Sequence, residues 1–376
     1  NSGTGNIPVQ ENITLSNSSS GTITYTVTPS TSFCTGASQN FIITVNPIPQ
    51  ISNFTETICD DNPFSSITPE DVTNGIVPVG TTYTWVIADT SSDAIIGGSA
   101  STEPSDTIPG SNLTLEGGTT TPQNLIYTVI PLSADNCEGI PFTITITVNP
   151  TAEVNEIASQ VWCNAESTDA VVFTTDNTVG TTTYAWTNNN ISIGLDDSGT
   201  GNIPSFTAIA GTTSQTATIV VTPTFTYNGE ACTGPTETFT ITVNPTAEVN
   251  EIASQVLCNT ESTVAVVFTT DNTDGTTTYS WTNDNTATGL AESSGTGNIP
   301  SFTATATTSP EVSNIVVTPT YTNNGIECIG PTETFTITVN PTAQVDQPGN
   351  YEYCNGDTAT VDFTTSNGGV DSVTTY

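Results

Sequence analysis

An alternation of apolar residues with threonine is the dominant pattern along this chain. Apolar residues occupy every second position in three segments, 142–148, 239–243 and 335–339, and threonines fill the positions between them. A period of two with one apolar face predicts β-strands of an antiparallel sheet whose other face is solvated. We therefore expect the apolar residues of these segments to lie in a core.

Further strands are predicted upstream of each alternating segment. Between residues 151 and 245 the candidates are 170–174, 181–186, 205–208 and 216–226. Asn, Gly and Pro separate them, as expected of turns. A proline falls late in each penultimate strand, at Pro29, Pro131, Pro223 and Pro319. Because proline lacks an N–H, it predicts an edge position or a bulge there.

The strand pattern recurs with a nearly constant period. The triplet Val-Asn-Pro ends at Pro47, Pro150, Pro245 and Pro341, which gives periods of 103, 95 and 96 residues. Such periodicity predicts tandem domains. The predicted repeats are 1–47, 48–150, 151–245, 246–341 and 342–376, of which the first and the last are partial. Because the chain lacks Met and starts and stops within repeats, we expect it to be a piece of a longer protein.

Each whole repeat is predicted to be an immunoglobulin-like β-sandwich. About seven short strands in about 95 residues, without helical periodicity, are typical of that fold. One tryptophan near the middle of each whole repeat, Trp85, Trp186 or Trp281, is expected to anchor the core. The chain as a whole is predicted to be an all-β tandem array forming an elongated rod, in which each repeat contacts chiefly its neighbours.

Cysteines recur once early and once late in each repeat, which predicts disulfides and an oxidising compartment. Pairing within repeats would join Cys59 to Cys137, Cys163 to Cys232, and Cys258 to Cys328. Cys34 and Cys354 would then be unpaired or bridged to residues outside the chain. Pairing across repeat boundaries would instead join Cys34 to Cys59, Cys137 to Cys163, Cys232 to Cys258, and Cys328 to Cys354.

Geometry favours the pairing within repeats. If successive sandwiches lie end to end, the extended path between cysteines on either side of a boundary spans up to about 80 Å. A disulfide tolerates a Cα separation of only about 4.4–6.8 Å. Metal binding is the weaker interpretation of these cysteines, because the chain has no His and no Cys-x-x-Cys pair.

Composition excludes several classes of function. The 376 residues include 37 Asp and Glu but no Lys, Arg or His. Nucleic-acid binding needs cationic side chains, anionic membranes repel such a chain, and no apolar run is long enough for a spanning helix. We therefore expect neither nucleic-acid binding nor membrane insertion. Without His or Lys as a base near neutral pH, we expect no enzyme activity and no cofactor.

Carboxylates are the remaining candidates for chemistry. Two glutamate pairs recur at equivalent positions, Glu153 with Glu156 and Glu248 with Glu251. We interpret them as a solvated face, not as the acid and base of a glycosidase. The segment 271–275, Asp-Asn-Thr-Asp-Gly, partly matches a calcium loop. Its counterpart 176–180 lacks the second acid, so Ca²⁺ binding is the weaker alternative to a β-turn.

Several strings of the repeat resemble those of a known family. They are Ser-Gly-Thr-Gly-Asn-Ile-Pro at 198–204 and 294–300, Tyr-x-Trp-Thr-Asn upstream of it, and Thr-Phe-Thr-Ile-Thr-Val-Asn-Pro at the end. They resemble the PKD/Ig-like repeats of the SprB-type gliding-motility adhesins, giant surface proteins of Bacteroidota. The resemblance covers essentially the whole chain and is closest over 151–341.

The resemblance implies a stalk segment of an extracellular filamentous adhesin at the cell outer surface, serving adhesion and gliding motility after type IX secretion. The implied partners are an extracellular substratum or polysaccharide and, through regions outside this chain, the gliding machinery and type IX secretion components. It also implies O-glycosylation at Thr107, Thr358 and Ser372. Two alternatives stay open: a carbohydrate-binding β-sandwich array, marked by solvent-facing Trp or Tyr pairs, and accessory repeats of a secreted enzyme.

Overall fold

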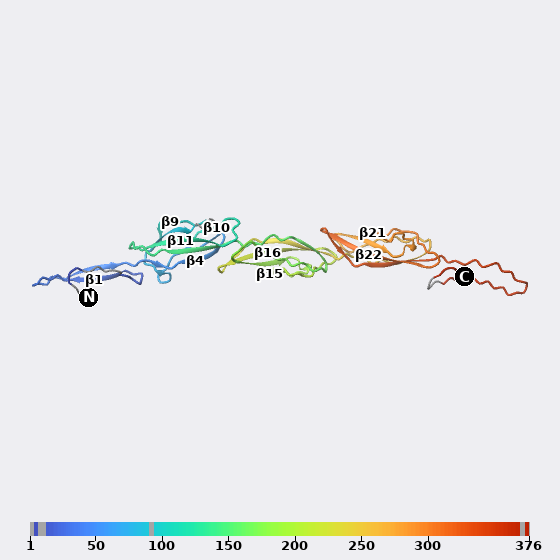
Figure 1. The fold of residues 1–376 in the computed structure, drawn as a ribbon, viewed down its shortest axis with the longest axis horizontal. Coiled ribbons are helices and arrows are strands. Elements are labelled where there is room, and N and C mark those ends of the chain that lie inside the picture. The colour runs from blue at the N-terminus through green and yellow to red at the C-terminus, as the bar shows by residue number, and fades with distance from the viewer. Residues whose placement is uncertain (1–3, 7–12, 90–93, 369–372, 376) are drawn as a thin grey trace. The chain divides into compact units, whose positions relative to one another are not determined.

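The computed structural model describes residues 4–6, 13–89, 94–368 and 373–375, and its regular structure is almost entirely β-strand (Figure 1). The chain divides into two compact units, and the division runs through the predicted repeat 151–245. The first unit comprises 1–155, 173–185 and 221–237, and the second comprises 156–172, 186–220 and 238–376. The repeat boundaries themselves stay a prediction.

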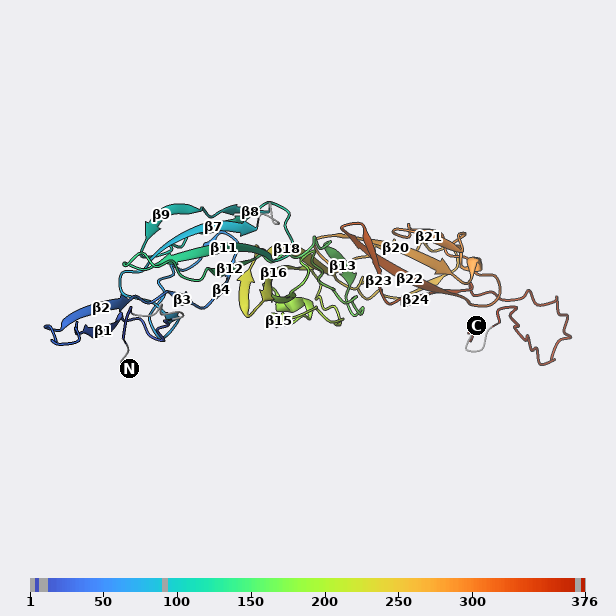
Figure 2. The same ribbon diagram turned by 60° about the vertical axis from the view of Figure 1, so that its left-hand side comes forward.

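In the first unit, residues 54–149 form two sheets. The larger has the order β4 (Phe54–Cys59), β12 (Phe142–Asn149), β11 (Gln123–Leu132), β7 (Thr82–Asp89) and β9 (Ser101–Ser105) (Figure 2). The smaller has the order β5 (Asn62–Pro63), β10 (Asn112–Leu115) and β8 (Ile95–Gly97). Strand β4 runs parallel to β12, whereas β11 pairs antiparallel with β12 and β7.

Both sheets contribute to one core. Leu113 of the smaller sheet and Val129, Ile144 and Ile146 of the larger sheet are all fully buried and belong to the same apolar cluster. The burial of such apolar side chains makes the main favourable contribution to the free energy of folding. The all-β sandwich prediction is therefore confirmed. The unit also contains two short pairs: β1 (Gly21–Val27) with β2 (Gln39–Val45), and β3 (Gln50–Ile51) with β6 (Gly75–Ile76).

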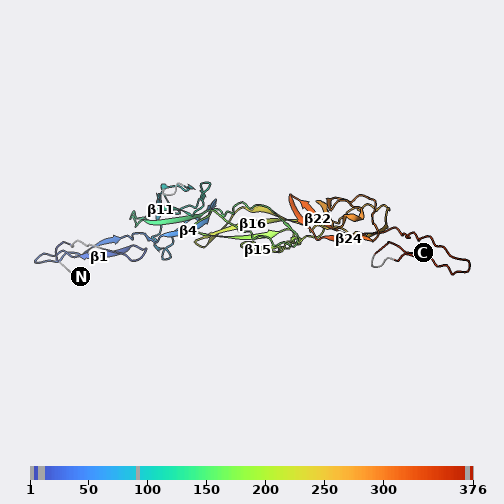
Figure 3. The ribbon, with the colours of Figure 1, turned by 45° about the vertical axis from the view of Figure 1, so that its right-hand side comes forward.

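In the second unit, residues 246–341 form a six-stranded sheet. Its order is β19 (Gln255–Cys258), β24 (Glu333–Asn340), β22 (Glu311–Asn323), β20 (Thr276–Asn283) and β21 (Ser294–Thr296), with β23 (Ile326–Ile329) paired to the end of β22. Figure 3 labels β22 and β24 of this sheet. The strands of 151–245 follow the same order: β13 (Gln160–Cys163), β18 (Glu237–Asn244), β16 (Gln215–Tyr227), β14 (Thr181–Asn188) and β15 (Ser198–Thr200), with β17 (Glu230–Thr233) on β16. The 3₁₀ turns η1 (Ile191–Ile193) and η2 (Thr286–Thr288) follow β14 and β20.

The alternating pattern places side chains as predicted. Phe335, Ile337 and Val339 of β24 are at most 2% exposed. Two other strand predictions, 170–174 and 205–208, are wrong. Each segment contributes only one isolated bridge, Val171 with Ile203 in the first and Thr207 with Ser167 in the second. Pro204 lies between the bridges, and its missing N–H prevents a continuous ladder.

Proline in the penultimate strand marks a change of partner. Val317 of β22 pairs with Glu333 of β24, and Thr320 pairs with Ile329 of β23. Pro319 lies between the two ladders and pairs on its other side with Tyr279 of β20 in continuous register. The predicted edge position or bulge is therefore wrong for this proline, which instead marks the change of partner. Beyond it, β22 and β23 form a hairpin that extends past the start of β24.

An Asn-Gly turn closes the β22–β23 hairpin and the equivalent β16–β17 hairpin. Asn324 and Gly325 have φ of 49° and 77°, and Asn228 and Gly229 have φ of 51° and 81°. Positive φ at both central residues is the type I′ geometry of tight hairpins, for which Asn-Gly is the favoured sequence. The turns therefore hold β17 and β23 at the far ends of β16 and β22.

Tyr83 is expected to make the first unit sensitive to alkali. It is 2% exposed and lies edge-on to Phe142, and burial raises its pKa to about 12 from 10.0. Because the folded state disfavours the phenolate, its contribution to stability is fully present below pH 10.0 and is lost as pH rises toward 12. Tyr83→Phe should raise the alkaline unfolding midpoint, followed by circular dichroism. Tyr351→Phe, at an exposed position, is the control; equal midpoints for all three proteins would contradict this.

Candidate functional site: the disulfide-linked ends of adjacent repeats

Two disulfides join the early cysteine of one repeat to the late cysteine of the next. Cys59–Cys232 lies in the first unit and Cys163–Cys328 in the second, with Cα separations of 5.5 and 5.6 Å. The predicted pairs Cys59–Cys137, Cys163–Cys232 and Cys258–Cys328 are therefore wrong. The alternative pairing across boundaries is wrong as well. Within the part of the chain that the structure describes, four cysteines have no sulfur partner: Cys34, Cys137, Cys258 and Cys354.

Strand direction explains why a repeat does not bridge its own cysteines. Cys258 lies opposite Asn340, at the C-terminal end of β24. Strand β22 runs antiparallel to β24, so the hairpin that carries Cys328 lies beyond the N-terminal end of β24. The eight residues of β24 separate the two cysteines by about 25 Å. That separation excludes a disulfide within the repeat.

A buried asparagine receives the hairpin of the following repeat. Cys59 lies opposite Asn149 at the end of β12, and Asn149 is fully buried. Its Nδ2 donates to the carbonyl oxygens of Tyr227 at 3.0 Å and Glu230 at 3.3 Å, on either side of the Asn-Gly turn. The hairpin is thus fixed by its backbone next to Cys59.

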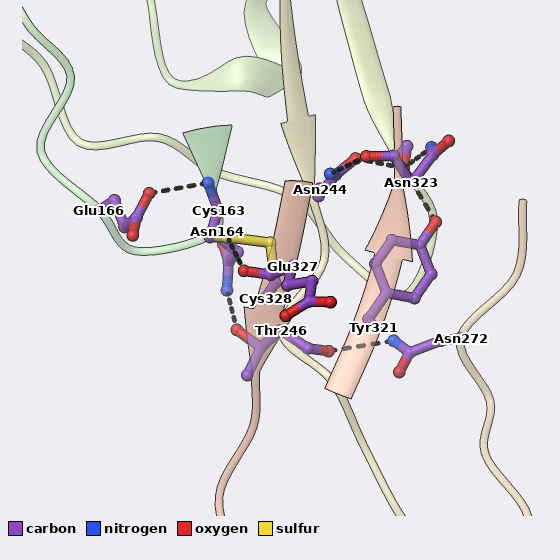
Figure 4. The surroundings of a disulfide bond; sticks show 11 residues. Cys163, Asn164, Glu166, Asn244, Thr246, Asn272, Tyr321, Asn323, Glu327 and Cys328 are labelled. Atoms are coloured by element: carbon purple, nitrogen blue, oxygen red, sulfur yellow. Dashed lines mark hydrogen bonds between the residues drawn. A yellow bond between two sulfur atoms is a disulfide. The ribbon is translucent and has the colours of Figure 1, made fainter. Parts of the chain in front are cut away.

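The second junction uses the same arrangement (Figure 4). Cys163 lies opposite the fully buried Asn244. The Nδ2 of Asn244 donates to the carbonyl oxygen of Asn323 at 3.1 Å. The N–H of Cys163 donates to the Glu166 carboxylate at 2.9 Å, which holds the backbone at the disulfide. Each junction therefore combines one covalent bond with hydrogen bonds to the hairpin backbone.

Hydroxyl groups distinguish the second junction from the first. Ser214 Oγ donates to Asn244 Oδ1 at 3.0 Å and accepts from Asn323 Nδ2 at 2.8 Å. Tyr321 Oη lies 3.0 Å from Ser214 Oγ and donates to the carbonyl oxygen of Thr273 at 2.9 Å. The hydroxyls thus complete a network around the buried amide of Asn244.

The first junction lacks these hydroxyls. Pro122 directly precedes β11, as Ser214 directly precedes β16. Phe225 lies opposite Cys232, as Tyr321 lies opposite Cys328. Correspondingly, the Oδ1 of Asn149 is buried and has no hydrogen-bond partner among the described residues. Serine occurs with tyrosine at one junction, and proline occurs with phenylalanine at the other.

Tyr321→Phe should destabilise the second unit by about 1–2 kcal/mol, because it removes hydrogen bonds of a buried network. Combined with Ser214→Ala, the loss in free energy of unfolding should be smaller than the sum of the single losses, since both remove the same network. Urea unfolding of the four proteins measures this coupling. Strictly additive losses would show that the hydroxyls act independently.

The linkers between repeats are held by an asparagine of the following repeat. Asn272 Nδ2 donates to the carbonyl oxygen of Thr246 at 3.1 Å, and its Oδ1 accepts from the N–H of Glu248 at 2.8 Å. Asn177 makes the equivalent bonds in the first unit. Asn272 belongs to the segment considered for Ca²⁺, in which Asp274 has φ of 65°. The chain bends at residues 271, 274 and 275, and the β-turn stays a prediction. Among the described residues, no group of three or more His, Cys, Asp or Glu is placed to hold a metal ion.

The other residues singled out in the sequence lie outside the junctions. Glu153, Glu156, Glu248 and Glu251 are all exposed, as expected of a solvated face. Trp85, Trp186 and Trp281 are 5–6% exposed, so their prediction as core residues is confirmed. Thr107 is half-buried and shares a hydrogen bond with Thr68, Thr358 is exposed, and Ser372 lies outside the described residues.

The asparagines of the junctions were missed in the sequence, although a signal for them exists. Asn149 and Asn244 belong to the recurring Val-Asn-Pro triplet, which served only to count repeats. The Asn-Gly pairs at 228–229 and 324–325 likewise predict tight hairpins directly before the late cysteines.

None of the described helices is long and apolar enough to cross a membrane.

Comparison with protein families finds a PKD-like domain at residues 56–152. This match overlaps most of the predicted repeat 48–150. No curated protein matches the chain in sequence.

Several solved structures are similar to this chain over most of its length, with TM-scores below 0.5. They include the I67–I69 fragment of the titin I-band (8% identity, 78% of this chain and 97% of that chain covered, TM-score 0.43). Mouse cadherin-23 EC22–24 has 14% identity, coverage of 78% and 97%, and a TM-score of 0.32. The Sidekick-1 immunoglobulin domains 1–4 have 10% identity, coverage of 87% and 95%, and a TM-score of 0.29.

Proposed function

We propose that this chain is a non-catalytic stalk segment of an extracellular filamentous adhesin of the SprB type, serving adhesion and gliding motility at the outer surface of a Bacteroidota cell. The observation that carries the proposal is the pair of disulfides that link consecutive repeats. Disulfides persist in oxidising compartments. A series of PKD-like repeats covalently joined to their neighbours suits a load-bearing element outside the cell.

The position of the cysteines supports a mechanical role. Cys163 lies inside the loop closed by Cys59–Cys232, so the two disulfide loops overlap over residues 163–232. Under tension, the shortest covalent path between Cys59 and Cys328 therefore runs through residues 163–232. Residues 60–162 and 233–327 are protected from extension while both bonds are intact.

The charge of the chain fits the same role. Its 37 carboxylates without a single Lys or Arg disfavour association between copies through like-charge repulsion. The proposed partners are an extracellular substratum or polysaccharide and, through other regions of the protein, the gliding machinery and type IX secretion components. This assignment rests on the resemblance of the repeat strings.

The carbohydrate-binding alternative has one observation in its favour. The rings of Tyr351 and Tyr353 stack at a centroid distance of 6.3 Å and an angle of 19°, and both side chains are exposed. Stacked exposed aromatics can bind sugar rings. However, Leu257, which holds the position of Tyr353 relative to the early cysteine of its repeat, packs against a core. We therefore place the alternative second.

The stalk assignment is tested by pulling the chain from its two ends in an optical trap. With both disulfides intact, full extension should fall short of that of the reduced chain by on the order of 700 Å, because the shortest covalent path between Cys59 and Cys328 then contains only residues 163–232 instead of 59–328. Equal extension in both states would contradict the mechanical role. Surface location is tested with antibodies to residues 48–341 on intact cells of the source organism; labelling only after permeabilisation would contradict an adhesin.

A further inference from the structure

Cys258 has no sulfur partner in the described residues and is exposed, yet it ends a strand in the same way as the bonded cysteines. It lies opposite Asn340 in a parallel pair of strands, as Cys163 lies opposite Asn244. Position and strand direction are therefore those of a disulfide-forming cysteine of this chain.

The hydrogen bonds around Cys258 are also those of a junction. Its N–H donates to the Glu261 carboxylate at 2.7 Å. The N–H of Asn259 donates to the carbonyl oxygen of Asn340 at 2.8 Å. In the complete junction, the N–H of Cys163 donates to the Glu166 carboxylate at 2.9 Å, and the N–H of Asn164 donates to the carbonyl oxygen of Asn244 at 2.8 Å. The backbone at Cys258 is thus already held in the bonded geometry.

The linker that follows Asn340 is folded as in the complete junctions. Asn367 Nδ2 donates to the carbonyl oxygen of Thr342 at 3.0 Å. Its Oδ1 accepts from the N–H of Gln344 at 2.6 Å. Asn272 holds the preceding linker with the equivalent pair of bonds, at 3.1 and 2.8 Å. Asn367 is therefore tied to the linker as Asn272 is at the preceding boundary.

This junction differs from the other two in that no hairpin of the described residues covers its asparagine. Asn340 is only half-buried, whereas Asn149 and Asn244 are fully buried beneath the hairpin of the following repeat. Cys258, Asn259 and Asn340 form an open surface, which we call the Cys258 face. Within the described residues, no hairpin lies on it.

We propose that the Cys258 face is the receptor for the Asn-Gly hairpin of a further repeat of this kind, and that Cys258 forms a disulfide with the cysteine of that hairpin. The cysteine stands three residues after the turn glycine, as Cys232 follows Gly229 and Cys328 follows Gly325. The Nδ2 of Asn340 donates to the backbone carbonyl that precedes the turn. The proposal concerns the cross-link alone and stands independently of the adhesive function.

Closing this bond is a two-electron oxidation, and a disulfide is the oxidant. The thiolate of one cysteine attacks a sulfur of the disulfide donor and releases one donor thiol. The thiolate of the other cysteine then attacks the mixed disulfide, which forms the new S–S bond and releases the second donor thiol. The two protons of the protein thiols end on the two donor thiols.

The Cys258 face also selects the kind of hairpin. Pro310 directly precedes β22, at the position that Pro122 and Ser214 hold before β11 and β16. Phe225 occurs with Pro122, and Tyr321 occurs with Ser214, so a hairpin with Phe opposite its cysteine fits beside Pro310. The hairpin of residues 224–233 is of this type.

The test extends the full chain beyond Tyr376. The sequence Val-Thr-Thr-Tyr at 373–376 aligns its final tyrosine with Tyr184, so residues 185–245 are added after Tyr376. The protein is oxidised with oxidised glutathione, free thiols are alkylated, and cysteine-containing peptides are mapped without reduction. We expect a peptide that joins Cys258 to the added copy of Cys232, loss of alkylation at Cys258, and continued alkylation at Cys354.

Two further proteins serve as controls. In the extended chain with Cys258→Ser, the added cysteine should become open to alkylation while Cys59–Cys232 and Cys163–Cys328 stay intact. A second extended chain, with residues 280–341 added instead, covers the case in which the first addition does not fold. A bond from the added cysteine to Cys354, or a free added cysteine in both extended chains, would overturn the proposal.

Discussion

Replacing both Cys163 and Cys328 by serine should lower the free energy of unfolding of the second unit by about 5 kcal/mol. The bond closes a loop between residues 165 apart in sequence. In the chain-entropy description, cross-linking so long a loop removes much of the conformational freedom of the unfolded chain. The double replacement is used because a single one would leave a reactive thiol at the junction. Urea unfolding, with and without prior reduction, measures the loss.

The matched control is Cys258→Ser, which removes an exposed cysteine without a sulfur partner in the described residues. It should leave the urea midpoint unchanged. Reduction should destabilise the chain that retains Cys163 and Cys328, and it should have less effect on the chain that lacks them. If the double replacement shifts the midpoint no more than Cys258→Ser does, the disulfide contributes nothing to the folded junction.

The fold could be predicted from the sequence because its signals are local. The period of two along β24 determines which side chains are buried, and the result holds for Phe335, Ile337 and Val339. The tryptophans are local signals in the same sense. The short segments 170–174 and 205–208 were mispredicted because apolar content alone does not ensure continuous pairing on both sides of Pro204.

The disulfide pairing could not be obtained in this way, because it depends on strand direction. Both candidate pairings assumed that a cysteine bonds within its own repeat or to the nearest one along the chain. The parallel pairing of β19 with β24 places Cys258 at one end of the sheet, and the hairpin of β22 and β23 places Cys328 at the other. An early cysteine can then reach only the late cysteine of the following repeat, as in Cys163–Cys328.

A glycine at the end of each late hairpin allows the hairpin to approach the linker of the preceding boundary. A Cβ atom on Gly330 would lie 1.8 Å from the carbonyl oxygen of Ala247, and on Gly234 it would lie 1.8 Å from that of Ala152. Both alanines are fully buried. The N–H of Gly330 also donates to the carbonyl oxygen of Pro319 at 3.0 Å, so the hairpin is fixed on its other side.

Gly330→Ala should therefore destabilise the second unit by about 3 kcal/mol, since the clash is with backbone and no rotamer change relieves it. The displaced hairpin should also carry Cys328 away from Cys163, so a larger fraction of both thiols should be open to alkylation after refolding. Gly211→Ala is the matched control in the same unit, because no atom lies within 4 Å of its Cβ position. Comparable stability and complete disulfide formation in both variants would mean that hairpin and linker can separate without loss, and that the disulfide alone holds the repeats together.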